Sequence, residues 1–137
     1  MNRSQLRENV FKLLYLSGFN GEDEMENQIR LYFEGQDIVP EAKDQAYIEE
    51  KYTKTKEHLA QIDQMLNDTS EGWKTSRMGK VDLAILRLAV YEMLFDEDVP
   101  VSVAINEAVE LAKKFGTDES SSFINGILGK LAKKADA

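Results

Sequence analysis

The run from Val81 to Phe95 constrains the fold more than any other stretch of this sequence. Wound as a helix of about four turns, it is apolar around nearly its whole circumference, yet it is too short to span a bilayer. Such a helix is stable in water only when other helices cover it on every side. The sequence therefore predicts an all-α protein with this helix at the centre of a bundle.

Apolar residues repeat at helical spacing in further stretches, which supply the covering helices. The expected helices cover residues 4–17, 23–34, 42–67 and 102–115, and a C-terminal stretch that starts at Thr117 or Asp118. The apolar alternation from residue 42 to residue 67 is unbroken, so it predicts one long helix. The expected N-terminal caps are Ser4, Asp23 and Ser102.

The length of 137 residues suits a single domain, residues 1–137, which can bury about two thirds of its unfolded surface. A turn-rich loop divides this domain into an N-terminal helical half, 1–70, and a C-terminal helical half, 79–135. No proline- or serine-rich linker separates the two halves. Trp73 lies in the loop and is expected to anchor it by burying its ring against the bundle, an interpretation favoured over base stacking.

Charge is unevenly distributed along the chain, whose formal net charge is -8. Residues 21–50 hold two basic and ten acidic side chains and so carry -8 by themselves, whereas residues 1–20 carry +2. The total argues against a generally basic nucleic-acid binder. A nucleic acid could still contact one local basic face, while the acidic stretch stays solvated or faces a basic protein.

The sequence contains none of the usual motifs for bond chemistry. It has no cysteine, no glycine-rich phosphate loop, no HExxH and no GxSxG. The single histidine, His58, lacks clustered carboxylates or thiols and is expected to be an ordinary surface residue. We therefore expect no enzyme, no metal site and no cofactor. The N-terminus has no apolar signal region and no helix suits a membrane, so a cytoplasmic location is expected.

Two charged residues interrupt the central apolar run. Arg87 and Glu92 are five positions apart and lie on different helix faces, so they cannot pair with each other along the helix. Their partners are expected on neighbouring helices or at a binding surface. Asn106 and Glu107 are expected to bond to nearby backbone or to the Arg87 guanidinium. Gly126 suggests the close approach of another helix or of a ligand backbone.

A dense, ordered set of residues runs through the second half of the chain. It consists of Trp73, Arg77, Lys80-Val81-Asp82, Ala84-Ile85-Leu86-Arg87-Leu88-Ala89, Tyr91-Glu92, Val99-Pro100, Val103 to Lys113, Phe115-Gly116 and Phe123-Ile124-Asn125-Gly126-Ile127-Leu128. This set resembles the NusB family of bacterial transcription antitermination factors. The resemblance continues in a weaker form to the first helix.

The resemblance implies an all-α bundle of about six to seven helices in two packed three-helix subdomains. It also implies a factor that binds the boxA RNA of ribosomal-RNA leader transcripts together with ribosomal protein S10 (NusE). Such a factor promotes ribosomal-RNA transcription and acts indirectly with other Nus factors and RNA polymerase. The residues implied to contact RNA are Arg3, Arg7, Lys12, Tyr15, Glu119 and Phe123, and those implied to face the protein partner are Asp82 and Arg87.

The chain also departs from the family pattern. Family members with a strong N-terminal arm have a cluster of arginines, whereas only Arg3 and Arg7 precede Glu8 here. RNA binding is therefore expected to depend on the partner, and Phe123 can be either an RNA contact or a core residue. A helical interaction or homodimer module without RNA binding is the main alternative. A methyltransferase-linked helical domain is another, but it would require a glycine-rich cofactor-binding domain that the sequence lacks.

Overall fold

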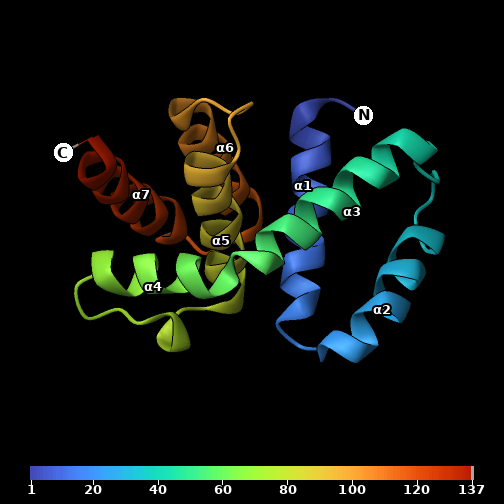
Figure 1. Cartoon of the computed structure of the whole chain (residues 1–137), viewed down its shortest axis with the longest axis horizontal. Coiled ribbons are helices and arrows are strands. Elements are labelled where there is room, and N and C mark those ends of the chain that lie inside the picture. Colours follow the sequence, from blue (N-terminus) through green and yellow to red (C-terminus); the bar gives the residue numbers. More distant parts are fainter. Residues whose placement is uncertain (137) are drawn as a thin grey trace. The chain divides into compact units, whose positions relative to one another are not determined.

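The computed structural model describes residues 1–136, and the side chains of residues 1–135. Within residues 1–136 the regular elements are seven α-helices and one 3-10 turn, without a strand (Figure 1). The expected all-α class is thereby confirmed. The final residue of the expected 1–137 domain lies outside the described residues. The chain forms two compact units, residues 1–54 and 55–137, and the interpretation as one domain with halves 1–70 and 79–135 stays a prediction.

The N-terminal unit contains α1 (Arg3–Ser17), α2 (Glu22–Glu34) and most of α3 (Ala42–Glu57). The predicted cap of α1, Ser4, is wrong because Asn2 takes that role. The Asn2 side chain accepts a hydrogen bond from the Gln5 amide at 2.8 Å, and the Gln5 side chain accepts one from the Asn2 amide at 2.9 Å. This reciprocal pair satisfies two amides at the helix start. Arg3 is therefore the first residue of the helix.

The start of α2 also differs from the expected one. Gly21 takes the capping position in place of Asp23, and the helix begins at Glu22. The first turn then holds Glu22, Asp23 and Glu24, whose negative charges suit the positive end of the helix dipole. α2 packs against α1. The core side chains of this unit are Val10, Phe11, Leu13, Leu14, Met25, Phe33, Ile48 and Tyr52.

The half-buried side chain of Tyr32 makes the N-terminal unit sensitive to high pH. Tyr32 donates a hydrogen bond to the side-chain oxygen of Asn9. Burial raises the pKa of Tyr32 to about 12 from 10.0, and the negative charge of Glu8 adds to the effect. Burial also raises the pKa of Tyr52. Both side chains therefore favour the folded state while they are protonated.

We expect the stability from Tyr32 to be complete below pH 10 and to be lost between pH 10 and about pH 12. The sign follows because the folded protein holds this proton more tightly than the unfolded chain does. Tyr32→Phe should unfold more easily near neutral pH but lose less stability over this alkaline range than the parent. Urea denaturation on both sides of pH 10 measures the difference. Equal alkaline losses in the two proteins would contradict the assignment.

The predicted single helix over residues 42–67 is wrong. The chain forms α3 and α4 (Leu59–Thr69), and His58 between them leaves the helical conformation at φ -98° and ψ 9°. The His58 amide still donates to the Thr55 carbonyl at 3.2 Å, and its own carbonyl accepts from the Ile62 amide at 2.9 Å. A one-residue break of this kind preserves the apolar alternation, so periodicity alone does not reveal it.

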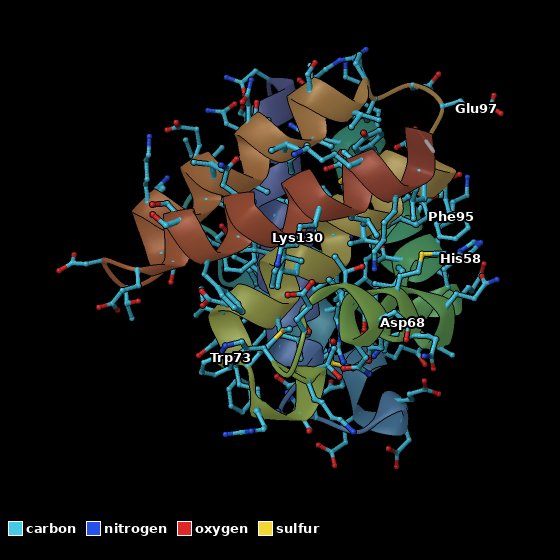
Figure 2. The ribbon with its side chains drawn as sticks, turned by 90° about the vertical axis from the view of Figure 1, so that its left-hand side faces the viewer. His58, Asp68, Trp73, Phe95, Glu97 and Lys130 are labelled. Atoms are coloured by element: carbon cyan, nitrogen blue, oxygen red, sulfur yellow. The ribbon has the colours of Figure 1, made fainter. Side chains whose placement is uncertain are left out.

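His58 is not the ordinary surface residue that the sequence predicted. Its half-buried ring lies 4.2 Å from the ring of Phe95 and 5.7 Å from that of Tyr91, measured between centroids. Figure 2 shows His58 beside Phe95 at the end of α5. His58 therefore packs the break between α3 and α4 against the central helix.

The C-terminal unit is built around α5 (Lys80–Phe95), which packs against α4, α6 (Val101–Phe115) and α7 (Ser120–Asp136). The prediction of a helix buried around its circumference is confirmed. Its buried residues are Leu83, Ala84, Ile85, Leu86, Leu88, Ala89, Val90, Tyr91, Glu92 and Met93. The helix α4 also packs against α7. The bundle of this unit therefore consists of α4, α5, α6 and α7.

The ends of α6 and α7 differ from the expected ones. Pro100, and not Ser102, directly precedes the first residue of α6. Proline has no backbone N–H, and at a helix start this costs no hydrogen bond because the first amides have no partner within the helix. α7 begins at Ser120, three residues after Thr117, and the Ser120 hydroxyl accepts a hydrogen bond from the Thr117 amide at 2.9 Å. A Cβ on Gly116 would lie 2.5 Å from the Ser120 side chain. Glycine is thus required where α6 turns into α7.

Candidate nucleic-acid interface

Two aromatic rings meet on the surface of the C-terminal unit. Phe123 lies in the first turn of α7 and is partly exposed, whereas Trp73 in the loop after α4 is 53% exposed. Their ring centroids are 6.0 Å apart and their planes make an angle of 74°. Edge-to-face contact of this kind is favourable and leaves ring faces available for other partners. Flat unpaired bases stack on such faces.

Positive charge accompanies these rings. Arg77 ends the 3-10 turn η1 (Thr75–Arg77), and its guanidinium carbon lies 5.8 Å from the centroid of the Trp73 ring. Lys74 and Lys80 flank the turn, and no acidic residue occurs from residue 73 to residue 80. A cation near an aromatic face is attracted to it, and guanidinium groups also bind phosphate. The segment therefore combines aromatic surfaces for base stacking with cationic side chains that can bind phosphate.

The loop that carries Trp73 is held by hydrogen bonds of its backbone. The Trp73 amide donates to the Ser70 carbonyl at 3.3 Å, and the Ser70 hydroxyl donates to the Trp73 carbonyl. The Thr75 amide donates to the side-chain oxygen of Asn67 at 2.8 Å. Gly72 has a φ of 97°, a conformation that glycine adopts without strain.

The prediction that Trp73 anchors this loop by burying its ring is therefore wrong. Hydrogen bonds fix the loop, and the ring projects from it at the edge of the unit (Figure 2). An exposed tryptophan is unusual for a residue of this size, and clustered exposed aromatics mark contact surfaces. Base stacking, the less favoured interpretation of this residue from sequence, fits its exposure better.

The residues of α1 that were expected to contact RNA differ in exposure. Arg3 is exposed at the first position of the helix, whereas Arg7, one turn later, is 5% exposed. Lys12 is partly exposed and lies 3.2 Å from the Glu8 carboxylate. Tyr15 is partly exposed and packs edge to face with Phe19 at 5.0 Å. Of the two predicted arm arginines, only Arg3 presents its side chain to solvent.

Glu119 and Phe123 lie one turn apart, because the Phe123 amide donates to the Glu119 carbonyl at 3.0 Å. Glu119 is exposed and directly precedes α7, where a negative charge complements the helix dipole. The favourable interaction with the helix dipole is therefore enough to explain an acidic residue at position 119. The structure places these two residues together near the start of α7.

Arg87, an expected protein-partner residue, forms a bidentate ion pair with Asp63 of α4. Its Nε and Nη2 atoms lie 2.9 Å and 2.8 Å from the two carboxylate oxygens. α4 thus supplies a carboxylate to Arg87, and the expectation that Asn106 and Glu107 bond to nearby backbone or to this guanidinium stays a prediction. Asp82, the other expected partner residue, lies in the first turn of α5 and is partly exposed.

The C-terminal helix contributes further cations. Lys130, which is labelled in Figure 2, lies 3.4 Å from the Glu71 carboxylate. Lys134 donates to the Asp68 carbonyl at 3.1 Å, close to the end of α4. A Cβ on Gly126 would meet nothing within 4 Å. Among the described residues no neighbouring helix approaches Gly126 closely, so that part of the expectation is wrong. The approach of a ligand backbone at Gly126 stays a prediction.

A groove of the N-terminal unit is a less suitable place for RNA. This groove, of about 630 Å³, lies against α2 and α3. Its lining includes four acidic residues and a single arginine, which are Asp23, Glu26, Glu34, Glu49 and Arg30. Its negative charge disfavours phosphate. Among the described residues no cluster of His, Asp or Glu side chains could hold a metal ion. Within residues 1–136 none of the helices is long and apolar enough to traverse a bilayer.

Comparison with known proteins decides the family. The profile that defines the NusB family matches residues 4–133. The chain belongs to the NusB family. Transcription antitermination protein NusB of Agathobacter rectalis is 50% identical over 132 residues, which cover 96% of this chain and all of that protein. NusB of Acetivibrio thermocellus is 47% identical, over 97% of this chain and 90% of that protein.

Solved structures of NusB proteins share this fold. The NusB structure from T. maritima is 35% identical and superimposes with a TM-score of 0.85, over 98% of this chain and 92% of that one. A chain in the crystal structure of the antitermination factors NusB and NusE in complex with double-stranded RNA gives a TM-score of 0.84 over 96% of each chain. Its identity is 23%, so this second likeness shows the shared NusB fold.

Proposed function

We propose that this chain is a transcription antitermination factor that binds boxA-type RNA of ribosomal-RNA leader transcripts together with ribosomal protein S10 (NusE). The observation that carries the proposal is the 50% identity with an antitermination protein over 96% of the chain. A solved complex of the same fold contains NusB, NusE and RNA, which is the set of partners proposed here. Other Nus factors and RNA polymerase would be reached indirectly.

The RNA contacts that we propose follow the exposure of the side chains. Arg3 and Lys12 supply charge on α1, with Tyr15 near the end of that helix, and Phe123 supplies a ring at the start of α7. Glu119 borders the ring. Arg7 is buried, so we propose that it supports α1 from within the fold more than it contacts phosphate. Asp82 and the neighbouring surface of α5 would face S10.

The protein acts by binding, without catalysis, in the cytoplasm. Stacking on unpaired bases and pairing with phosphates require no cofactor and no bond chemistry. The net charge of -8 limits the affinity for RNA alone. A basic protein bound beside the RNA would offset this charge, so S10 should strengthen RNA binding.

Fluorescence anisotropy of a labelled boxA-type RNA tests the proposal, with and without S10 and at two salt concentrations. We expect binding that tightens with S10. With three or four phosphate contacts, the logarithm of the affinity should fall with the logarithm of the salt concentration with a slope of about -2 to -3. If a folded sample binds no RNA in either condition, a helical interaction or homodimer module becomes the better account, and its mass in solution should be measured next.

Replacing Phe123 by alanine should weaken RNA binding by about 1–3 kcal/mol, because a base would lose its stacking partner. The same anisotropy titration measures the loss. Tyr47→Ala is the matched control, since Tyr47 is a 43% exposed aromatic residue on α3 within the acidic part of the sequence. It should leave the affinity unchanged. Retained affinity in Phe123→Ala would remove this residue from the interface, and loss of its fold would assign the ring to the core.

A further inference from the structure

We propose that Trp73 and Arg77 belong to the RNA interface and take a second unpaired base beside the one on Phe123. The inference rests on the proposed RNA-binding function and extends it to residues of the loop between α4 and α5. It predicts that the chain binds two unpaired bases close together along one strand. Three features of the C-terminal unit support this second base site.

The first feature is the geometry of the two rings. The planes of Trp73 and Phe123 meet at 74° with their centroids 6.0 Å apart. One flat base cannot stack on two rings that are nearly perpendicular. Each ring therefore offers its own face, and two bases that are splayed apart can use both. Single-stranded RNA allows such splaying, whereas stacked duplex does not.

The second feature is the exposure of Trp73. Its side chain is 53% exposed although the loop around it is fixed by the Ser70 and Asn67 hydrogen bonds. The loop does not depend on burial of the indole for its conformation. A large ring that projects from a fixed backbone and packs against Phe123 loses little conformational freedom when a base stacks on it, which favours binding.

The third feature is the charge beside the ring. The Arg77 guanidinium lies 5.8 Å from the indole centroid, and Lys74 and Lys80 flank the same turn. The neighbouring acid, Glu71, already lies 3.4 Å from Lys130. A nucleotide whose base stacks on Trp73 would thus find a cation for its phosphate. A neutral apolar partner would gain nothing from these charges, so a nucleic acid fits the segment better.

The chain itself supplies the probe for this proposal. Trp73 is the single tryptophan of the sequence, so its fluorescence reports on this position alone. A base that stacks on the indole should quench the emission during titration with single-stranded boxA-type RNA. S10 should be used with any tryptophan of its own replaced by phenylalanine. Quenching should follow the same binding curve as the anisotropy of the labelled RNA.

Variants at the two positions separate stacking from charge. Trp73→Leu should weaken RNA binding about fivefold or more, whereas Trp73→Phe should keep most of the affinity because a ring remains. Arg77→Gln should reduce the salt slope by about 0.7, and Arg77→Lys should retain it if the contact is to phosphate. Circular dichroism and urea denaturation should show that Trp73→Leu stays folded, because hydrogen bonds of the backbone hold the loop.

The outcomes distinguish this proposal from the proposed function. RNA binding without any change in Trp73 emission, together with unchanged affinity in Trp73→Leu, would overturn the second base site and leave the RNA-binding function intact. A change in emission caused by S10 alone, with no effect of RNA, would make Trp73 a protein contact and also overturn it. The absence of RNA binding in every condition would remove the proposed function and this inference with it.

Discussion

Replacing Ile124 by alanine should lower the free energy of unfolding of the C-terminal unit by about 2–5 kcal/mol. Ile124 lies on α7 and is fully buried, and the shortened side chain would leave a cavity within the packed helices. The loss combines the transfer of the removed methyl and methylene groups with the cavity that remains. Urea denaturation followed by circular dichroism measures it. A loss of a few tenths of a kcal/mol would contradict the described packing of α7.

The neighbouring residue supplies a crossed control. Phe123 is partly exposed, so Phe123→Ala should cost less stability than Ile124→Ala while it costs more RNA affinity. Folded Ile124→Ala should bind RNA like the parent at a temperature where it is fully folded. If both substitutions changed both properties equally, the division of α7 into a core face and a contact face would be wrong.

Breaking the ion pair between Arg87 and Asp63 should have the second largest effect. Arg87→Met should cost about 1–3 kcal/mol, because Asp63 would keep a partly buried charge without its bidentate partner. The two side chains are 19% and 25% exposed, so solvent compensates incompletely. The double variant Arg87→Met with Asp63→Leu should recover much of the loss, since no unpaired charge remains. A double-mutant cycle of unfolding free energies measures the coupling.

The exposed pair of Arg30 and Glu34 is the control for that cycle. It also joins a guanidinium to a carboxylate, at 3.2 Å, but its side chains are 59% and 61% exposed. Arg30→Met should change stability by no more than about 0.5 kcal/mol. Equal losses at the two pairs would show that burial does not strengthen the Arg87 contact, and no recovery in the double variant would place the role of Arg87 elsewhere.

Periodicity predicted the helices well because it reports which residues face a core. The buried character of α5 and the termination of α1 at Gly18 and of α2 at Gly35 follow from side chains close in sequence. The break at His58 does not, because it shifts no apolar residue out of the alternation. The N-terminal cap of α1 is also not determined by periodicity. Ser4 and Asn2 are both suitable caps, and the reciprocal bond with Gln5 decides between them.

The candidate site was harder to predict than the fold. Arg7 lies on the same helix face as Val10, Phe11 and Leu14, so its position in the sequence indicates burial. Its positive charge favours the opposite expectation, a side chain in contact with phosphate. The partner of Arg87 was not available, because Asp63 comes from another helix and from sequence no contact between them is visible.

Trp73 shows a different limit of sequence-based prediction. Hydrophobicity favours burial of an indole, but hydrogen bonds within the loop fix the backbone from which this ring projects. Its spacing from Arg77, four residues within a segment free of acids, is the signal that could have identified a contact surface. Such a signal becomes convincing once the ring is found exposed.

The loop between α4 and α5 has unequal evolutionary freedom at two adjacent positions. Gly72, at a φ of 97°, can be replaced only with backbone strain. Position 73 carries no such constraint, because the bonds that shape the loop come from its backbone and from Ser70 and Asn67. A lineage can therefore exchange the side chain at position 73 without first acquiring compensating mutations elsewhere. Ligand preference in this loop can diverge by single substitutions while the helical scaffold stays the same.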